Sequence, residues 1–235
     1  MIPCVVFMFI WATLVWDPIA RWVWNTSGWA LQLGALDFAG GTVVHIASGT
    51  SALAYSYMLG KRRGHGTQEL AYRPHSVALI VLGTVFLWIG WFGFNAGSAL
   101  TASLRAVMAV FVTNLSASVG GITWCLLDYR LERKLSTVGF CSGVVAGLVA
   151  ITPGSGFVPP WAGFIFGVAG ASSANFATKI KYFVHCDDAL DIFAMHAVAG
   201  FTGNLLTGIF AAYVALFPLP FRSSPHKLRK PKINH

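Results

Sequence analysis

Seven stretches of mainly apolar residues, separated by short polar connections, limit what this sequence can fold into more than any other feature. They run over 2–16, 38–60, 76–99, 106–127, 136–152, 157–177 and 192–217. A helix that crosses a bilayer needs about 20 such residues. Hydrophobic residues make up 56% of the chain and charged residues only 10%, whereas soluble domains hold about 25% charged residues. A water-soluble fold could not bury so much apolar surface. The sequence therefore predicts an all-α polytopic membrane protein in a lipid bilayer.

The stretch over 136–152 is the shortest complete one, and we expect it either to be tilted little or to be buried against its neighbours. Glycines with small-xxx-small spacing, at Gly143/Gly147 and Gly163/Gly167, are typical of close helix packing in membranes.

The formal net charge of +8 does not indicate a nucleic-acid partner, because the basic residues lie in short runs between the apolar stretches. That arrangement is typical of cytoplasmic loops. The four cysteines show neither the spacing of metal ligands nor the density of a disulfide scaffold. The sequence predicts no metal and no cofactor.

The basic loops also predict an orientation, because lysine and arginine concentrate on the cytoplasmic side of membrane proteins. Three loops on one side hold Lys61, Arg62, Arg63 and Arg73; Arg130, Arg133 and Lys134; and Lys179 and Lys181. The opposite loops hold almost no basic residue except Arg105. We place the three basic loops in the cytoplasm.

The two ends of the sequence depart from this pattern. The first stretch begins without a basic region and runs into Trp16-Asp17-Pro18, so we expect it to be the end of a span whose beginning is absent. Residues 218–235 form a basic tail that this orientation would place outside. We expect that a final helix is absent and that the tail is disordered or not native. The alternative is that the charge rule is statistical and the tail lies outside.

Two stretches carry a histidine in matching surroundings. Asp37 is followed by His45 and Gly49, and Asp188 is followed by His196 and Gly200, so both read Asp-x7-His-x3-Gly. The loop charges make the first stretch enter from outside and the second from inside. Inverted repeats of this kind place a substrate pathway near the midplane of the bilayer.

The depth of the two histidines agrees with this interpretation. Eight residues at 1.5 Å carry each histidine about 12 Å from its own membrane face, which leaves the rings about 6 Å apart in depth in a core about 30 Å thick. An intramembrane histidine is a functional candidate by default. A structural hydrogen bond between helices is the alternative, and a metal site is disfavoured because no third ligand lies near.

The aspartates beside these stretches predict helix caps. Asp37 precedes a helix start, where a carboxylate accepts backbone N–H bonds, and it would add negative potential to an outer cation site. Asp187, Asp188 and Asp191 open the last stretch in the same fashion and complement its helix dipole.

Three motifs in this order resemble the Amt/Mep/Rh family of ammonium transporters. They are DFAGGTVVH at 37–45, GWFGFNAGSA at 90–99 and DDALDIFAMH at 187–196. The resemblance runs from about residue 10 to about residue 215, and the variants HIASG and GNLLTGIFA are similar to those of fungal members.

The resemblance implies an eleven-helix fold with inverted repeats, assembled as a homotrimer with one pore in each subunit. Residues 1–217 would correspond to the fourth to tenth helices of that domain. With the other helices absent, the pore would not be closed on all sides, and we do not expect this chain to transport anything alone.

The resemblance also implies roles for individual residues. His45 and His196 match the twin pore histidines of the family, and a histidine at the first position resembles the ammonium-sensing branch of fungal transporters. Phe94 matches one of two stacked gating phenylalanines, and Trp91 and Asn95 belong to the same motif.

An outer ammonium site would match Trp24, Ser98 and the backbone around Ala39. An indole face attracts a desolvated cation by up to about 2 kcal/mol, and a hydroxyl can accept one N–H bond. We therefore expect transport of ammonium or ammonia, with methylammonium as an analogue. Ammonium would lose its proton at this site, and ammonia would pass beside the histidines. By resemblance the location is the plasma membrane.

Three other interpretations stay open. The first is an ammonium sensor that signals without large flux, which the histidine at position 45 suggests. The second, an intramembrane enzyme, is poorly supported because no nucleophile–base pair or metal-ligand set is visible. The third is a gene product that is untranslated or misfolded.

Overall fold

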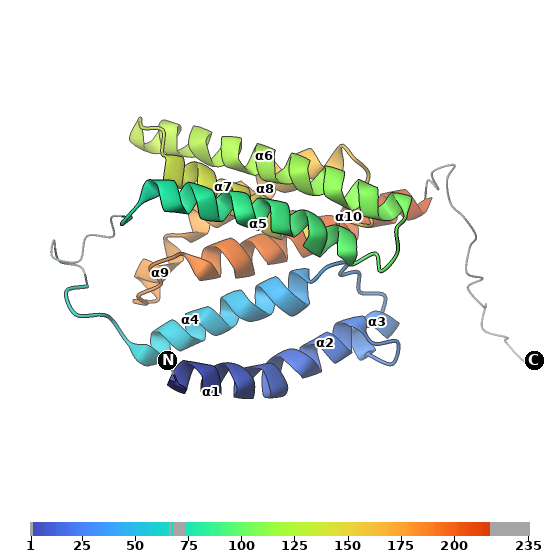
Figure 1. The fold of residues 1–235 in the computed structure, drawn as a ribbon, viewed down its shortest axis with the longest axis horizontal. Coiled ribbons are helices and arrows are strands. Elements are labelled where there is room, and N and C mark those ends of the chain that lie inside the picture. The colour runs from blue at the N-terminus through green and yellow to red at the C-terminus, as the bar shows by residue number, and fades with distance from the viewer. Residues whose placement is uncertain (1, 66, 68–73, 217–235) are drawn as a thin grey trace, which may run out of the picture.

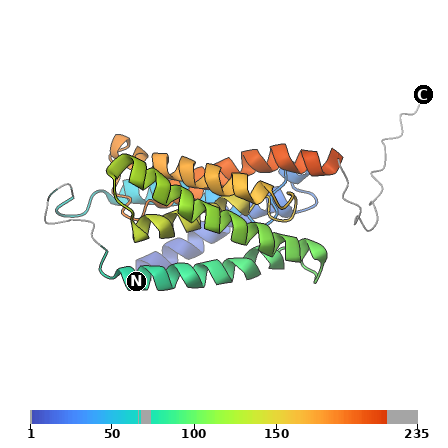
Figure 2. The same ribbon diagram turned by 90° about the horizontal axis from the view of Figure 1, so that it is seen from above.

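The computed structural model describes residues 2–65, 67 and 74–216, and within these residues it is helical with no strand. The helices lie roughly along one long axis, as Figure 1 and, from above, Figure 2 show. Four helical segments of this part are long and apolar enough to cross a membrane: Ile2–Gln32, Val77–Gly97, Leu104–Leu131 and Phe193–Ala211. The prediction of an all-α polytopic membrane protein is confirmed.

The first helical layer contains α1 (Ile2–Trp11), a π-helical turn η1 (Ala12–Trp16), α2 (Asp17–Trp24) and the short α3 (Trp29–Gln32). The apolar stretch predicted over 2–16 ends before Asp17-Pro18, and this boundary is wrong, because the helical segment runs over Ile2–Gln32. The helix continues because Pro18 stands at the start of α2, directly after the π-helical turn, where a missing N–H is tolerated.

A second group packs four helices around a buried centre: α5 (Val77–Gly97), α6 (Leu104–Glu132), α7 (Thr137–Ile151) and α8 (Ala162–Ala177). At about 1.5 Å per residue, α7 is shorter than the hydrocarbon core of a bilayer. It is buried along most of its length, which is one of the two arrangements expected for the shortest stretch. Its Gly147 lies against the backbone carbonyl of Ser116 on α6, where a Cβ atom would overlap. Small residues therefore set the close approach of α6 and α7.

The helix α8 begins later than the predicted stretch 157–177. Residues 152–161 form turns, and the helix starts at Ala162 after Pro159 and Pro160, because proline cannot donate the backbone bonds of a helix interior. The short α9 (Ile180–Phe183) follows α8 on the side of the basic loops.

Two composite helices run side by side in opposite directions through the middle of the molecule. One is η2 (Gly41–Ile46) with α4 (Ala47–Leu59), and the other is η4 (Phe193–Val198) with α10 (Ala199–Leu216). In Figure 1, α4 and α10 are traversed in opposite senses along the long axis. The position of Gly49 allows their backbones to meet, since a Cβ atom there would overlap the amide of Ala197. The inverted pair predicted from the motifs is therefore an observed feature of the fold.

Two sequence predictions fall outside the described residues. The basic tail over 218–235 is one, and Arg73 of the first basic loop is the other.

Candidate functional site

The two histidines of the matched motifs face each other across the antiparallel helices. His45 Nδ1 lies 3.3 Å from His196 Nδ1, and the ring centroids are 5.4 Å apart. His45 is buried, with 3% of its surface exposed. A bond between two Nδ1 atoms requires one ring to donate and the other to accept, so the two imidazoles hold complementary tautomers. The contact expected from the inverted repeat is present.

A carboxylate cap fixes the helix start on each side of the pair. Asp37 accepts four backbone N–H bonds, from Gly40 (2.8 Å), Gly41 (2.5 Å), Thr42 (2.8 Å) and Val43 (3.3 Å). Gly40 adopts φ +116°, a conformation that glycine adopts at low cost and that turns the chain back over the carboxylate.

The cap of the second helix is made by Asp188, which accepts the amides of Ile192 (3.1 Å) and Phe193 (3.0 Å). The two histidines therefore follow equivalent caps, eight residues after each aspartate.

An aromatic wall lies beside the histidine pair. The Trp91 indole stacks on the His45 ring at 5.2 Å and 15°, and Phe94 lies 5.8 Å from Trp91 in an edge-on arrangement. Trp91 Nε1 donates to Thr152 Oγ1 at 2.9 Å, so the residue directly after α7 holds the orientation of the indole. The tryptophan also packs against the core formed by α6, α7 and α8.

Asn95 has a different position from the other residues of its motif. Its side chain is fully buried and donates to Thr113 Oγ1 at 2.9 Å, which ties α5 to α6. Asn95 is not among the residues that line the cavity beside the histidines.

A cavity of about 390 Å³ opens beside the histidine pair. Its walls combine the two imidazoles with aromatic and aliphatic side chains: Val44, His45, Ser48, Phe86, Leu87, Gly90, Trp91, Phe94 and His196. The Nε2 atom of His45 has no hydrogen-bond partner among the described residues. The cavity therefore has mainly apolar walls that include both imidazoles, while His45 Nε2 itself is buried.

The residues predicted for an outer ammonium site are engaged in local contacts. Trp24 Nε1 donates to the carbonyl of Asp37 at 2.8 Å, and its exposed ring borders Gly40. Ser98 Oγ donates to the carbonyl of Phe94 at 3.0 Å, and Ala39 is buried in the turn after Asp37. Trp24 ends α2, Ala39 lies in the turn before η2, and Ser98 follows α5. Within the described residues, no hydrogen bond joins Ser98 to Trp24 or to that turn.

The aspartates of the last motif do not all cap the helix, so the prediction of one shared role is wrong. Asp187 instead accepts Arg62 from the loop after α4, at 2.9 Å from both Nε and a terminal guanidinium nitrogen. Asp191 pairs with Lys181 at 2.8 Å, and burial raises the pKa of the Asp191 carboxyl although Lys181 lowers it. Only one carboxylate can occupy the capping position, and the other two lie close to basic residues of neighbouring segments.

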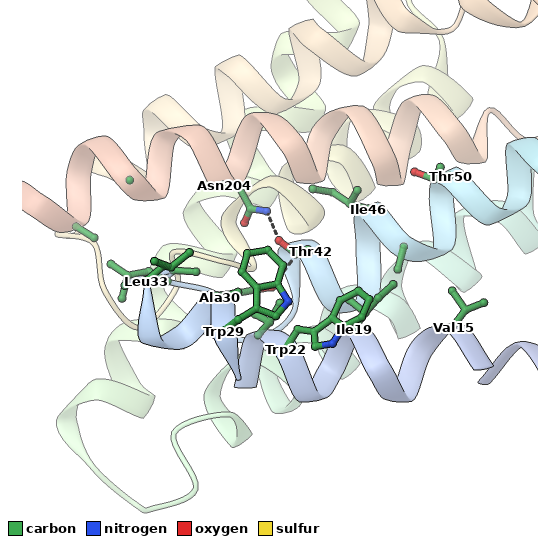
Figure 3. Close-up of a pocket in the computed structure, with 18 of the residues that line it drawn as sticks. Val15, Ile19, Trp22, Trp29, Ala30, Leu33, Thr42, Ile46, Thr50 and Asn204 are labelled. Atoms are coloured by element: carbon green, nitrogen blue, oxygen red, sulfur yellow. Dashed lines mark hydrogen bonds between the residues drawn. The ribbon is translucent and has the colours of Figure 1, made fainter. Parts of the chain in front are cut away.

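A second and larger cavity, of about 1060 Å³, lies between the α1–α3 layer and the composite helices. Figure 3 shows its apolar walls, with Asn204 of α10 pointing to Thr42 of η2. Asn204 Nδ2 donates to Thr42 Oγ1 at 2.6 Å. Neither histidine lines this cavity, although Asp37 does, so it is distinct from the cavity beside the histidine pair.

Sequence reasoning did not find Thr152, Thr42, Asn204 or the Arg62–Asp187 pair. Arg62 and Asp187 are 125 residues apart in the sequence, and neither stands in a repeated pattern. The one available signal was the polar character of Thr152 and Asn204 inside apolar stretches, which often indicates a hydrogen bond between membrane helices.

Membrane-length apolar helices around an inverted pair of histidines, one buried and one partly buried, define a polytopic helical membrane protein of the inverted-repeat class. Comparison with known proteins then shows the family. The Ammonium Transporter Family matches residues 1–227, and the chain belongs to this family.

Relatives and solved structures agree with that assignment. Ammonium transporter 1 of Schizosaccharomyces pombe is 61% identical over 212 residues, which cover 90% of this chain and 42% of that protein. The crystal structure of Saccharomyces cerevisiae Mep2 matches with a TM-score of 0.84 and 51% identity, over 90% of this chain and 49% of that one. A structure titled as a sensor Amt protein matches with a TM-score of 0.83 and 32% identity, over 89% of this chain and 54% of that chain. The chain thus spans about half the length of these proteins or less.

Proposed function

We propose that the protein carrying this chain transports ammonium or ammonia across a membrane, and that His45 and His196 line the path. The observation that carries the proposal is the imidazole pair, 3.3 Å apart, at the wall of an apolar cavity. A guest in that cavity would lie beside the imidazole pair, and it would bond His45 Nε2, which is buried and has no partner among the described residues, once a small shift of the ring uncovers this atom.

The chemistry of the residues favours passage as ammonia. A full charge near the bilayer centre costs several kcal/mol, so the pathway gains if ammonium gives up its proton before the apolar stretch. An imidazole pair with a shared Nδ1–Nδ1 bond can accept a proton at one ring and release one from the other. The proton then has a route beside the ammonia, along His45 and His196.

The outer part of the path is proposed to concentrate the cation. The exposed Trp24 ring would attract ammonium through its π face, the Ser98 hydroxyl would accept one N–H bond, and Asp37 would add negative potential from below the turn at Ala39. Phe94, in contact with Trp91, would exclude water between this site and His45.

We also propose a plasma-membrane location and a homotrimer for the whole protein, with the basic loops in the cytoplasm. These rest on family membership and on the distribution of lysine and arginine.

The experiment replaces the matched segment of Saccharomyces cerevisiae Mep2 with this chain, so that the chimera has the full length of a relative. Methylammonium uptake is measured in cells without other ammonium transporters. We expect the chimera to support uptake, and we expect His196→Ala to reduce it at least ten-fold or to change its selectivity against other cations.

The matched control is His75→Ala, which removes an exposed histidine from the loop before α5 and should leave uptake unchanged. Unaltered uptake and selectivity in the His196→Ala chimera would refute the role of the histidines. A chimera that reaches the membrane but takes up no methylammonium would refute transport itself.

A second candidate function is an ammonium sensor with little flux. It is favoured by the histidine at position 45, and by the structural match to a protein titled as a sensor. His45→Glu in the chimera separates the two functions, because loss of a signalling response with uptake intact supports sensing. Loss of both together argues against a separate sensing role.

A further inference from the structure

Each of the two histidines lies within a π-helical turn. The described part of the chain has three such turns: η1 (Ala12–Trp16), η2 (Gly41–Ile46) and η4 (Phe193–Val198). His45 belongs to η2 and His196 to η4, while η1 carries no histidine. Single π-helical turns inside α-helices are rare and occur frequently at functional sites.

The N-terminal end of each histidine turn is held by its cap. Asp37 binds the first amides of η2, and Asp188 binds the amides that open η4. These caps fix the residue at which each π-helical turn begins. They therefore also fix the rotation of the backbone about the helix axis at that residue.

The helix on the C-terminal side is held by packing. A Cβ atom at Gly49 would overlap the amide of Ala197, and a Cβ atom at Gly200 would lie 3.1 Å from the Gly41 carbonyl and from His45 Cβ. Both glycines therefore hold the two helices at one depth and one rotation relative to each other.

With both flanks fixed, the number of residues between them decides where each imidazole points. A π-helical turn holds one residue more than an α-helix over the same path, because its bonds run from i to i+5. One residue corresponds to about 100° of rotation about the helix axis. That rotation is large enough to turn a ring from the partner helix toward a different neighbour.

We propose that the additional residue in η2 and in η4 is the positioning device that brings the two imidazoles into contact. The effect of this positioning on transport rests on the proposed function. The positioning of the rings itself rests only on the caps and the glycine contacts. A helix without the extra residue would keep the flanks and lose the contact between the rings.

The test deletes one residue after the histidine in each turn, Ile46 from η2 or Val198 from η4, so that the Asp-x7-His spacing stays intact. The matched control deletes Leu14, an exposed residue of η1. All three variants are made in the Mep2 chimera, and their structures are determined in lipid nanodiscs.

We expect the Nδ1–Nδ1 distance to increase from 3.3 Å beyond the limit of a hydrogen bond, about 3.5 Å, in the Ile46 and Val198 deletions but not in the Leu14 deletion. Methylammonium uptake should fall at least ten-fold in the first two and stay within two-fold in the control. In a His45→Ala background, deletion of Ile46 should cost no further uptake, because the turn then has no ring to place.

Rings that stay in contact in both histidine-turn deletions would overturn the proposal. So would a failure of both to fold when the Leu14 deletion folds, since the turns would then serve stability. If the unmodified chimera takes up no methylammonium while the deletions separate the rings, the transport proposal fails and the positioning proposal stands.

Discussion

At the scale of single residues, the histidine pair depends on carboxylates that never touch it. Asp37 is 8% exposed and accepts four amides, so it replaces the hydrogen bonds that the first turn of a helix lacks. Asp188 does the same with two amides on the other helix. The depth of each ring in the bilayer follows from the position of its cap.

Removing the first cap should therefore lower stability measurably. Asp37→Ala would leave buried N–H groups without an acceptor, at about 1–3 kcal/mol for each such group. We expect a loss of at least 2 kcal/mol, about the upper end of cap deletions, measured by thermal unfolding of the chimera in detergent.

Asp37→Asn is the control for that measurement, because its amide oxygen still accepts and its volume is unchanged. The Asp37→Asn variant should unfold at a higher temperature than the Asp37→Ala variant. Equal unfolding temperatures for the Ala variant and the parent would show that the four bonds do not hold the turn.

At the scale of helices, the two composite helices show which features the sequence predicts and which it does not. The inverted motif predicted the meeting of His45 and His196, because the same spacing from each cap brings both rings to a similar depth. The motif predicted the local caps, but it could not predict the π-helical turns, since the glycine contacts on their C-terminal side come from tertiary structure. Nor could it predict the Arg62–Asp187 pair, which joins loops far apart in the sequence.

The close approach of the two composite helices gives a prediction at this scale. Gly49→Val would push α4 from η4, because its Cβ atom would overlap the Ala197 backbone. We expect about 1–3 kcal/mol of destabilisation, as for overpacked cores, and at least a ten-fold loss of methylammonium uptake.

The matched control is Gly83→Val on α5, where a Cβ atom has nothing within 4 Å. This variant should keep uptake and stability close to the parent. Similar losses at both positions would mean that the effect comes from valine in a helix and not from the helix contact.

At the scale of the whole molecule, the chain combines the α1–α3 layer, the group of four helices α5–α8 and the pair of composite helices. Within the group, α5, α6 and α8 pack around α7 and bury it. Basic loops lie at one end of the bundle and the turn after α5 at the other. This arrangement predicts which loops face the cytoplasm.

Cysteine labelling tests that orientation. In a chimera without its natural cysteines, a membrane-impermeant thiol reagent applied to intact cells should label Thr101→Cys between α5 and α6. It should label Leu135→Cys between α6 and α7 only after the cells are opened. Both positions are exposed, so the reverse pattern would contradict the assignment of the basic loops to the cytoplasm.

The most direct test of the central claim is a double-mutant cycle of methylammonium uptake at the two facing imidazoles. His45→Ala, His196→Ala and the double variant are compared with the parent chimera at equal surface amounts. Because the rings act as one bonded unit, we predict that the double variant takes up no less than the more impaired single variant. Parental uptake in either single variant, or losses that multiply in the double variant, would contradict a shared path through both rings.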